Sequence, residues 1–143
     1  MGAYSHSIDA KGRIILPADF RQELGLAFII TKGLDHCLFL YGQQAWEELA
    51  AKLRALSLAK PEARALSRFF FAGARNLECD KQGRFLVPAN LRVYAGLERK
   101  GDVVLAGADD RIEVWNKELW HTYCSEVEPD VTAMAASLSD FSI

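Results

Sequence analysis

The chain has 143 residues, of which half are hydrophobic, and a formal net charge of −2. This length allows a hydrophobic core, whereas a domain of half the length would be only marginally stable. No apolar run approaches the roughly 18 residues of a membrane-spanning helix, and the N-terminus lacks the basic and apolar regions of a signal peptide. We therefore expect a cytoplasmic protein with no membrane partner.

The residues that form metal and catalytic sites do not occur in recognisable patterns. The cysteines are odd in number, widely separated and without a CxxC pair: Cys37, Cys79 and Cys124. The three histidines lack metal-ligand spacing, and neither a glycine-rich phosphate loop nor an HExxH motif is present. We expect no metal, no cofactor, no small-molecule substrate and no catalytic residues, so the chain is predicted not to be an enzyme.

One motif occurs twice, at a constant offset of 71 residues. Residues 9–21 (DAKGRIILPADFR) return as residues 80–92 (DKQGRFLVPANLR) with the acid, glycine, two arginines, proline and alanine in place. The later parts of the repeats also match once three residues are inserted near 99–101. The duplication indicates two structural units, residues 2–48 and 73–122. A helical linker, 49–72, joins them, and a tail, 123–143, follows.

Each repeat is predicted to contain two strands, a short helix and two further strands. In the first repeat, residues 4–8 and 13–16 flank a tight turn and form a hairpin, because Asp9 and Gly12 have the side-chain chemistry of its first and fourth positions. A helix from Pro17 to Leu24 ends at Gly25. Strands at 28–31 and 37–41 follow, with equivalents at 103–106 and 112–115, and a helix starts near residue 43 or 116.

The linker is predicted to form an αα-hairpin that bridges the repeats, with the two repeats sharing one core. Two apolar helical faces support it, made of Trp46, Leu49, Leu53 and Leu56 and, after Pro61, of Leu66, Phe69 and Phe70. For the run of phenylalanines at 69–71 we favour a core position, and a subunit interface is the alternative.

The paired cations of the two turns are the candidate binding residues: Lys11, Arg13, Lys81 and Arg84. Arginine can form two hydrogen bonds with the major-groove edge of guanine, whereas lysine acts on phosphate mainly as a point charge. The turns themselves would be organised by Asp9, Gly12, Asp80 and Gly83. The alternative is that these cations are solvated and that Asp9 only pairs with Arg13, but the repetition of the arrangement favours binding.

Two further arginines recur on the short helices, and their role is left open. Arg21 and Arg92 are candidates for phosphate contacts. They could equally interact with a helix end or pair with Glu23 or another acidic residue.

The doubled Asp-x-x-x-Arg turn is followed by Pro-Ala, and the chain also contains Gly33-Leu34-Asp35, the run CLFLY at residues 37–41 and the paired tryptophans. In these features the chain resembles the MraZ family of bacterial transcriptional regulators. The resemblance covers about residues 2–123. It implies an α+β fold of two tandem SpoVT/AbrB-type domains that form a pseudo-dimeric swapped-hairpin β-barrel. It also implies a nucleoid-associated ring homo-oligomer that binds double-stranded DNA through the two Asp-x-x-x-Arg loops. The expected targets are repeated boxes upstream of the division and cell-wall gene cluster, usually repressed. Gly42, where proline is usual, is a small departure.

A protein-interaction module of the antitoxin type is the second functional hypothesis. The tail is acidic, since residues 121–143 contain four acidic and no basic residues. Its apolar residues, among them Met134 and Phe141, could wrap a partner. We favour docking of the tail onto its own core, or disorder.

Overall fold

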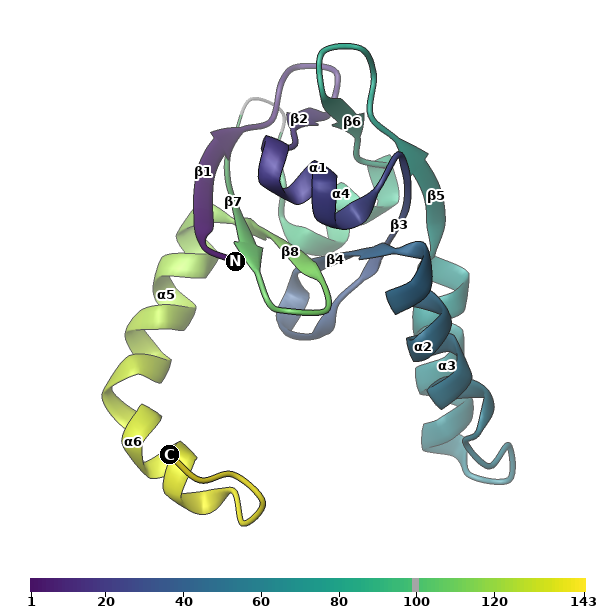
Figure 1. The fold of residues 1–143 in the computed structure, drawn as a ribbon, viewed down its shortest axis with the longest axis vertical. Helices are drawn as coiled ribbons and strands as arrows, with labels where there is room; N and C mark the ends of the chain where they lie inside the picture. Colours follow the sequence, from purple (N-terminus) through teal and green to yellow (C-terminus); the bar gives the residue numbers. More distant parts are fainter. Residues whose placement is uncertain (99–100) are drawn as a thin grey trace.

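The computed structural model describes residues 1–98 and 101–143, and both repeats have the predicted order of elements (Figure 1). The first repeat contains β1 (Ala3–Ser7), β2 (Arg13–Ile15), α1 (Ala18–Leu24), β3 (Ala27–Lys32) and β4 (Leu38–Gly42). The second contains β5 (Arg75–Glu78), β6 (Arg84–Leu86), α4 (Ala89–Ala95), β7 (Asp102–Gly107) and β8 (Ile112–Asn116). The insertion that we placed near 99–101 lies partly outside the described residues.

Strand pairing is exchanged between the repeats. Six strands form an antiparallel sheet in the order β1-β7-β8-β4-β3-β5, and β2 pairs with β6 in a separate two-stranded ribbon. The first strand of each repeat therefore pairs with the third strand of the other, β1 with β7 and β5 with β3. Neither repeat could satisfy its backbone hydrogen bonds in this way without the other.

The predicted hairpin of the first repeat is wrong in its pairing. β1 and β2 are joined only by an isolated bridge between Ile8 and Ile14, because their main partners lie in the second repeat. The tight turn at residues 9–12 is present, but it connects two strands that diverge into different sheets. Sequence patterns around a turn identify the turn more reliably than the partner of each strand.

The short helices are bounded by proline and glycine, as predicted, although each begins one residue after its proline. Pro17 has φ −54° and ψ 146°, which places it at the N-cap rather than in the first turn. Gly25 and Gly96 follow α1 and α4 with φ of 83° and 66°. A glycine is favoured where φ is positive, so both helices end where the sequence indicated.

The two repeats share one core, as predicted. Alternate residues of the sheet point to this core, as Leu38 and Leu40 do on β4, and the helices α1 and α4 contribute Phe20 and Leu91. An edge-to-face contact between Phe28 and Phe85, with ring centroids 5.9 Å apart, joins the first repeat to the second.

The other face of the sheet carries a second, aromatic-rich cluster. Here Phe39 and Tyr41 of β4 and Trp115 of β8 pack with residues of α2 (Gln43–Arg54) and α3 (Pro61–Gly73). These two helices contact each other and form the predicted helical hairpin. The hydroxyl of the buried Thr31 donates a 2.9 Å hydrogen bond to the carbonyl of Phe70 and fixes α3 on β3.

The phenylalanine run is divided between core and surface. Phe70 is buried, Phe69 is half-buried and Phe71 is exposed beside Trp46, with ring centroids 5.8 Å apart. A helix directs consecutive side chains about 100° apart, so the three rings cannot all enter one core. The core prediction is therefore confirmed for Phe70 and wrong for Phe71.

The C-terminal segment extends away from the sheet (Figure 1). It consists of α5 (Lys117–Val127), η2 (Glu128–Asp130) and α6 (Val131–Ser137). The amide of Asn116 accepts a hydrogen bond from Leu119 N–H and donates one to Gly96, which anchors α5 to the second repeat. The expectation that the tail docks onto its own core is wrong for α6, which lies apart from the body. Among the described residues, no helix is both long and apolar enough to cross a bilayer.

Candidate nucleic-acid interface

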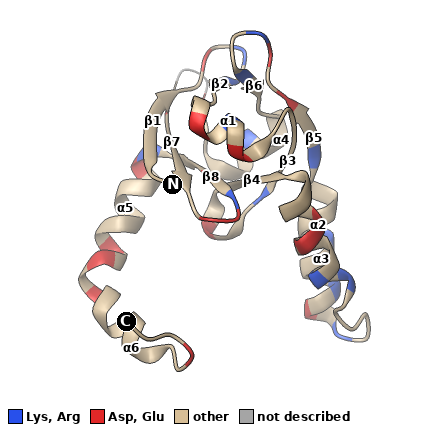
Figure 2. Ribbon diagram, viewed as in Figure 1, with Lys and Arg blue, Asp and Glu red and all other residues tan. Residues whose placement is uncertain are grey.

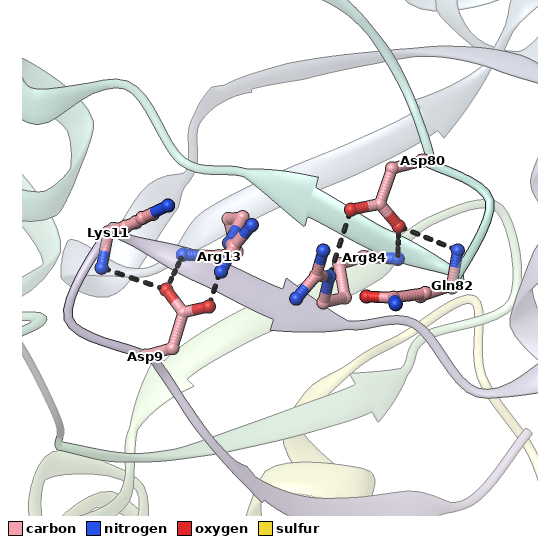
Figure 3. A network of polar contacts seen from close by, with 6 residues as sticks. All are labelled: Asp9, Lys11, Arg13, Asp80, Gln82 and Arg84. Atoms are coloured by element: carbon pink, nitrogen blue, oxygen red, sulfur yellow. Dashed lines mark hydrogen bonds and ion pairs between the residues drawn. The ribbon is translucent and has the colours of Figure 1, made fainter.

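The first turn is organised around the carboxylate of Asp9 (Figure 3). Its Oδ1 accepts hydrogen bonds from the backbone N–H groups of Lys11 and Arg13, each at 2.9 Å, and its Oδ2 accepts one from Nε of Arg13 at 2.8 Å. Gly12 closes the turn by donating to the carbonyl of Asp9, with φ of 85°. Both the acid and the glycine are therefore required by the shape of this turn.

The second turn repeats this geometry atom for atom. Asp80 accepts from the N–H groups of Gln82 and Arg84 at 2.9 Å, and from Nε of Arg84 at 2.9 Å. Gly83 donates to the carbonyl of Asp80 and has φ of 76°. In both turns the hydrogen bonds from the arginine backbone lower the pKa of the aspartate below its ordinary value, so both carboxylates stay ionised at neutral pH.

The ion pairs of the two turns use only part of each guanidinium. The side chains of Arg13 and Arg84 are each 27% exposed, and only their Nε atoms are engaged by the aspartates. Within the described part of the chain, no protein acceptor binds their Nη atoms. The pairing of Asp9 with Arg13 was the alternative to a binding role. It holds the Arg13 side chain in place while the Nη atoms of its guanidinium stay available to donate hydrogen bonds to a ligand.

The two arginines lie on neighbouring strands of one ribbon. In the register of β2 and β6, Arg13 is opposite Leu86 and Ile15 is opposite Arg84. Ile14 and Phe85 are opposite each other and are buried beneath the ribbon. Because strand residues alternate between faces, the outer face presents two arginines, each beside an apolar residue.

The sequence reasoning missed two of these outward residues, Ile15 and Leu86, which are 49% and 52% exposed. The signal was present, since strict alternation from Arg13 places residue 15 on the same face. It was obscured because Ile14, Ile15 and Leu16 form a continuous apolar run. Gln82 was also overlooked, although it occupies in the second turn the position of Lys11 in the first (Figure 3).

Arg21 and Arg92 each cover the turn of the opposite repeat. A methyl group on Gly12 would overlap Nη1 of Arg92, and one on Gly83 would overlap Nη1 of Arg21. Arg92 also donates from Nη1 to the carbonyl of Val87. Within the described residues neither arginine forms an ion pair with Glu23, which instead pairs with the N-terminal amine.

The turns are also joined by backbone hydrogen bonds. Val87 N–H donates to the carbonyl of Gly12, and Leu16 N–H donates to the carbonyl of Gly83, each at 2.9 Å. The two turns, the ribbon and the two arginines are therefore one interlocked unit at the end of the molecule opposite the helical hairpin (Figure 1). Lys11 and Lys81 are exposed at its tips, where Figure 2 shows basic residues.

Comparison with known proteins identifies the family. The family model for MraZ proteins, described as antitoxin-like, matches twice, over residues 1–69 and 70–141. A transcriptional regulator MraZ of Desulfitobacterium hafniense is 53% identical over 143 residues, covering 100% of this chain and 99% of the relative. Proteins of the same name from Moorella thermoacetica and Heliobacterium modesticaldum are each 50% identical with the same coverage.

These relatives are named as regulators and not as enzymes, which confirms the prediction that the chain is not an enzyme. The doubled match agrees with the duplication that the 71-residue offset indicated. With a family model covering almost the whole chain and full-length relatives at half identity, the chain belongs to the MraZ family.

Proposed function

We propose that this chain is a sequence-specific DNA-binding transcriptional regulator that reads double-stranded DNA with the β2–β6 ribbon and its two turns. The observation that carries the proposal is the ribbon's outer face, where Arg13 and Arg84 are each held at Nε by an aspartate with their Nη atoms unengaged. A two-stranded antiparallel ribbon fits the major groove of B-DNA. The names of the relatives are consistent with this activity.

Arg13 and Arg84 would each donate two hydrogen bonds to a guanine, a contact worth about 1–3 kcal/mol of discrimination. Ile15 and Leu86, exposed beside them, offer apolar contact for a thymine methyl group. Prior fixation by the aspartates lowers the entropy that the arginines lose on binding. Asp9 and Asp80 are turn-organising residues and would not face phosphate, which repels a carboxylate.

Lys11 and Lys81 would contact phosphates from the tips of the turns. Arg21 and Arg92 lie immediately behind the tips, against Gly83 and Gly12, and are candidates for further phosphate contacts. Each phosphate contact would release counterions and make binding sensitive to salt.

We also propose the finer architecture that the family resemblance implies, a pseudo-dimeric swapped-hairpin barrel of two SpoVT/AbrB-type domains. The exchanged pairs β1–β7, β5–β3 and β2–β6 support it. Domain limits at residues 2–48 and 73–122, a linker at 49–72 and a tail at 123–143 belong to the same proposal.

The proposed targets are repeated boxes upstream of the division and cell-wall gene cluster, including the chain's own promoter. The proposed effect is repression. The acting species would be a ring homo-oligomer in the cytoplasm, associated with the nucleoid. A single ribbon touches few phosphates. Several ribbons on one assembly, facing repeated boxes, would raise affinity by roughly 10²–10⁴, because later contacts become intramolecular.

A partner-binding, antitoxin-like role is the second candidate. The description of the family model and the exposed apolar residues of the C-terminal segment favour it. In that case the C-terminal segment, and not the ribbon, would be the functional surface.

Fluorescence anisotropy with the gene's own upstream DNA tests the proposal. The wild-type chain is expected to bind this DNA more tightly than scrambled DNA, and the Arg13→Ala/Arg84→Ala variant at matched oligomer size is expected to lose that preference. An Arg75→Ala variant, which removes an exposed cation of β5 outside the ribbon and the helical hairpin, is the matched control. Equal binding of both DNAs by the wild type would contradict the proposal and favour the partner-binding role.

A further inference from the structure

The C-terminal segment, residues 117–143, is here called the arm, and it carries an exposed apolar stripe. Its large apolar residues are between 37% and 55% exposed: Leu119 and Tyr123 on α5, Val131 and Met134 on α6, and Leu138 directly after α6. Within α5 and within α6, the intervals of four and three positions keep these side chains on one side of each helix. Exposed apolar residues gathered on a projecting segment are typical of an interaction site.

The arm is also strongly acidic. Residues 118–143 contain five acidic and no basic residues. Within the described part of the chain, none of these carboxylates forms an ion pair. The arm thus combines exposed apolar residues, here called its apolar stripe, with negative charge that has no ion-pair partner among the described residues; Figure 2 shows the red acidic segments along α5.

The helical hairpin formed by α2 and α3 has the complementary character. Residues 52–68 contain five basic residues and one acidic residue, and blue segments gather at this end of the hairpin in Figure 2. Its exposed apolar residues are Leu56, Leu58, Leu66 and Phe71. Lys60 and Arg68 have no ion-pair partner among the described residues.

We propose that the arm of one copy packs against the helical hairpin of a second copy, apolar stripe on apolar surface, with the acidic residues of the arm facing the basic residues of the hairpin. This inference rests on the proposed ring assembly and names the surfaces that would form it. Complementary potentials favour this pairing and disfavour contacts of arm with arm or of hairpin with hairpin.

The geometry favours a second copy over the chain's own hairpin. α5 contacts β7 and β8, whereas α3 packs on β3, and the arm and the hairpin diverge from the sheet as separate projections (Figure 1). A contact between two unlike surfaces is head-to-tail, and such contacts close into rings when the rotation permits. The two turns lie at the other end of the molecule, so this assembly leaves every ribbon accessible to DNA.

Charge reversal on each surface, followed by mixing, tests the proposal. One variant is Glu126→Lys/Glu128→Lys on the arm, and the other is Lys60→Glu/Arg68→Glu on the hairpin. Three of these changes suit the local helix ends, since Glu126→Lys and Glu128→Lys place lysine near the C-terminus of α5 and Lys60→Glu places glutamate before α3. Glu23→Lys/Asp102→Lys, two exposed carboxylates on the body, is the matched control.

Analytical ultracentrifugation of the full-length chains gives the readout. The wild type and the body control are expected to sediment as the same multiple of 15.9 kDa, and each reversed variant as a single chain. An equimolar mixture of the two reversed variants is expected to regain the large assembly, because each arm again meets a hairpin of opposite charge. Misfolding or an intramolecular arm–hairpin contact would not be rescued by mixing.

The proposal is overturned if a reversed variant keeps the wild-type mass, if the mixture stays monomeric, or if the wild type itself is monomeric. If the arm instead binds a different protein, one of these three outcomes is expected. Affinity for a DNA with a single box distinguishes failure of the arm–hairpin contact from failure of DNA binding by the ribbon, because a single box needs only one ribbon. Reversed variants should still prefer the box to scrambled DNA, while their affinity for DNA with several boxes falls by roughly 10²–10⁴.

Discussion

The two turns share a frame, the Asp, Gly and Arg of each motif, and differ at their tips, the two residues between Asp and Gly. Asp, Gly and Arg occupy equivalent positions in both, because the same three hydrogen bonds to the carboxylate and the same positive φ define the backbone. The two residues between Asp and Gly differ: Ala10 and Lys11 in the first turn, Lys81 and Gln82 in the second. The geometry of the turn constrains Asp, Gly and Arg, so within the turns only the two residues of each tip are free to differ.

The largest expected effect concerns the core that both turns share. Phe85→Ala removes a buried ring that lies opposite Ile14 beneath the ribbon and contacts Phe28. A substitution of this kind costs about 3–5 kcal/mol of unfolding free energy. Urea denaturation measures the loss. The transition should remain single, and separate unfolding of the two repeats would contradict a common core.

The next effect tests the crossed contacts between repeats. Gly12→Ala introduces a methyl group at positive φ and against Arg92, so we expect a loss of about 1–3 kcal/mol in unfolding free energy. Combination with Arg92→Ala should recover part of this loss, because the collision disappears.

The control for this pair is Arg21→Ala, whose arginine covers the other turn. The coupling between Gly12→Ala and Arg92→Ala is expected at about 0.5–3 kcal/mol, and that between Gly12→Ala and Arg21→Ala near zero. Equal coupling of Gly12 to both arginines in double-mutant cycles would show that the contacts are not crossed.

A smaller effect is expected when the first tip is converted into the second. Ala10→Lys/Lys11→Gln keeps the number of cations and changes only their positions. The salt dependence of DNA binding should be unchanged, whereas Lys11→Ala alone should lower its logarithmic slope by about 1 for each ribbon bound. Anisotropy at several salt concentrations gives both slopes. Identical box preferences of the wild type and the tip-converted variant would argue against a role of the tips in distinguishing DNA segments.

The smallest effect is the pH dependence of the frame. Hydrogen bonds from the backbone of Arg13 and Arg84 lower the pKa of Asp9 and Asp80 from the ordinary value of 3.8 on folding, so the stabilisation is fully present above that value. The contribution disappears as the pH falls through the lowered pKa of the folded state. Denaturation between about pH 2 and pH 7 should show a shallower acid dependence in Asp9→Asn/Asp80→Asn than in the wild type, with the difference arising below the ordinary pKa.

The sequence predicted the local elements well, because their signals are local. Proline and glycine bound α1 and α4, and Asp with Gly defines each turn. The partners of the strands could not be derived in the same way, since β2 carries no residue that distinguishes β6 from β1 as its neighbour. The pairing of strands from different repeats depends on how the two repeats pack together in the shared core, and local sequence signals do not encode it.

The sequence predicts the basic residues of the candidate site but not the apolar residues that lie beside them on the ribbon. Arg13 and Arg84 were found because they repeat, but their proximity arises from the β2–β6 register. Ile15 and Leu86 appear as part of the outer face only when that register is known. The positions of Arg21 and Arg92 over the opposite glycines are likewise tertiary contacts between residues about 60 or 80 positions apart in the sequence.

The most direct test of base reading by the ribbon is a double-mutant cycle between an arginine and a single guanine atom. Each guanine of the bound upstream DNA is replaced in turn by 7-deazaguanine, which lacks the N7 acceptor, and affinity is measured for the wild type, Arg13→Ala and Arg84→Ala. We predict that the wild type loses affinity at particular guanines and that each arginine variant is insensitive at one of them. If the losses from protein and DNA are additive at every guanine, the arginines do not read the bases and the central claim is wrong.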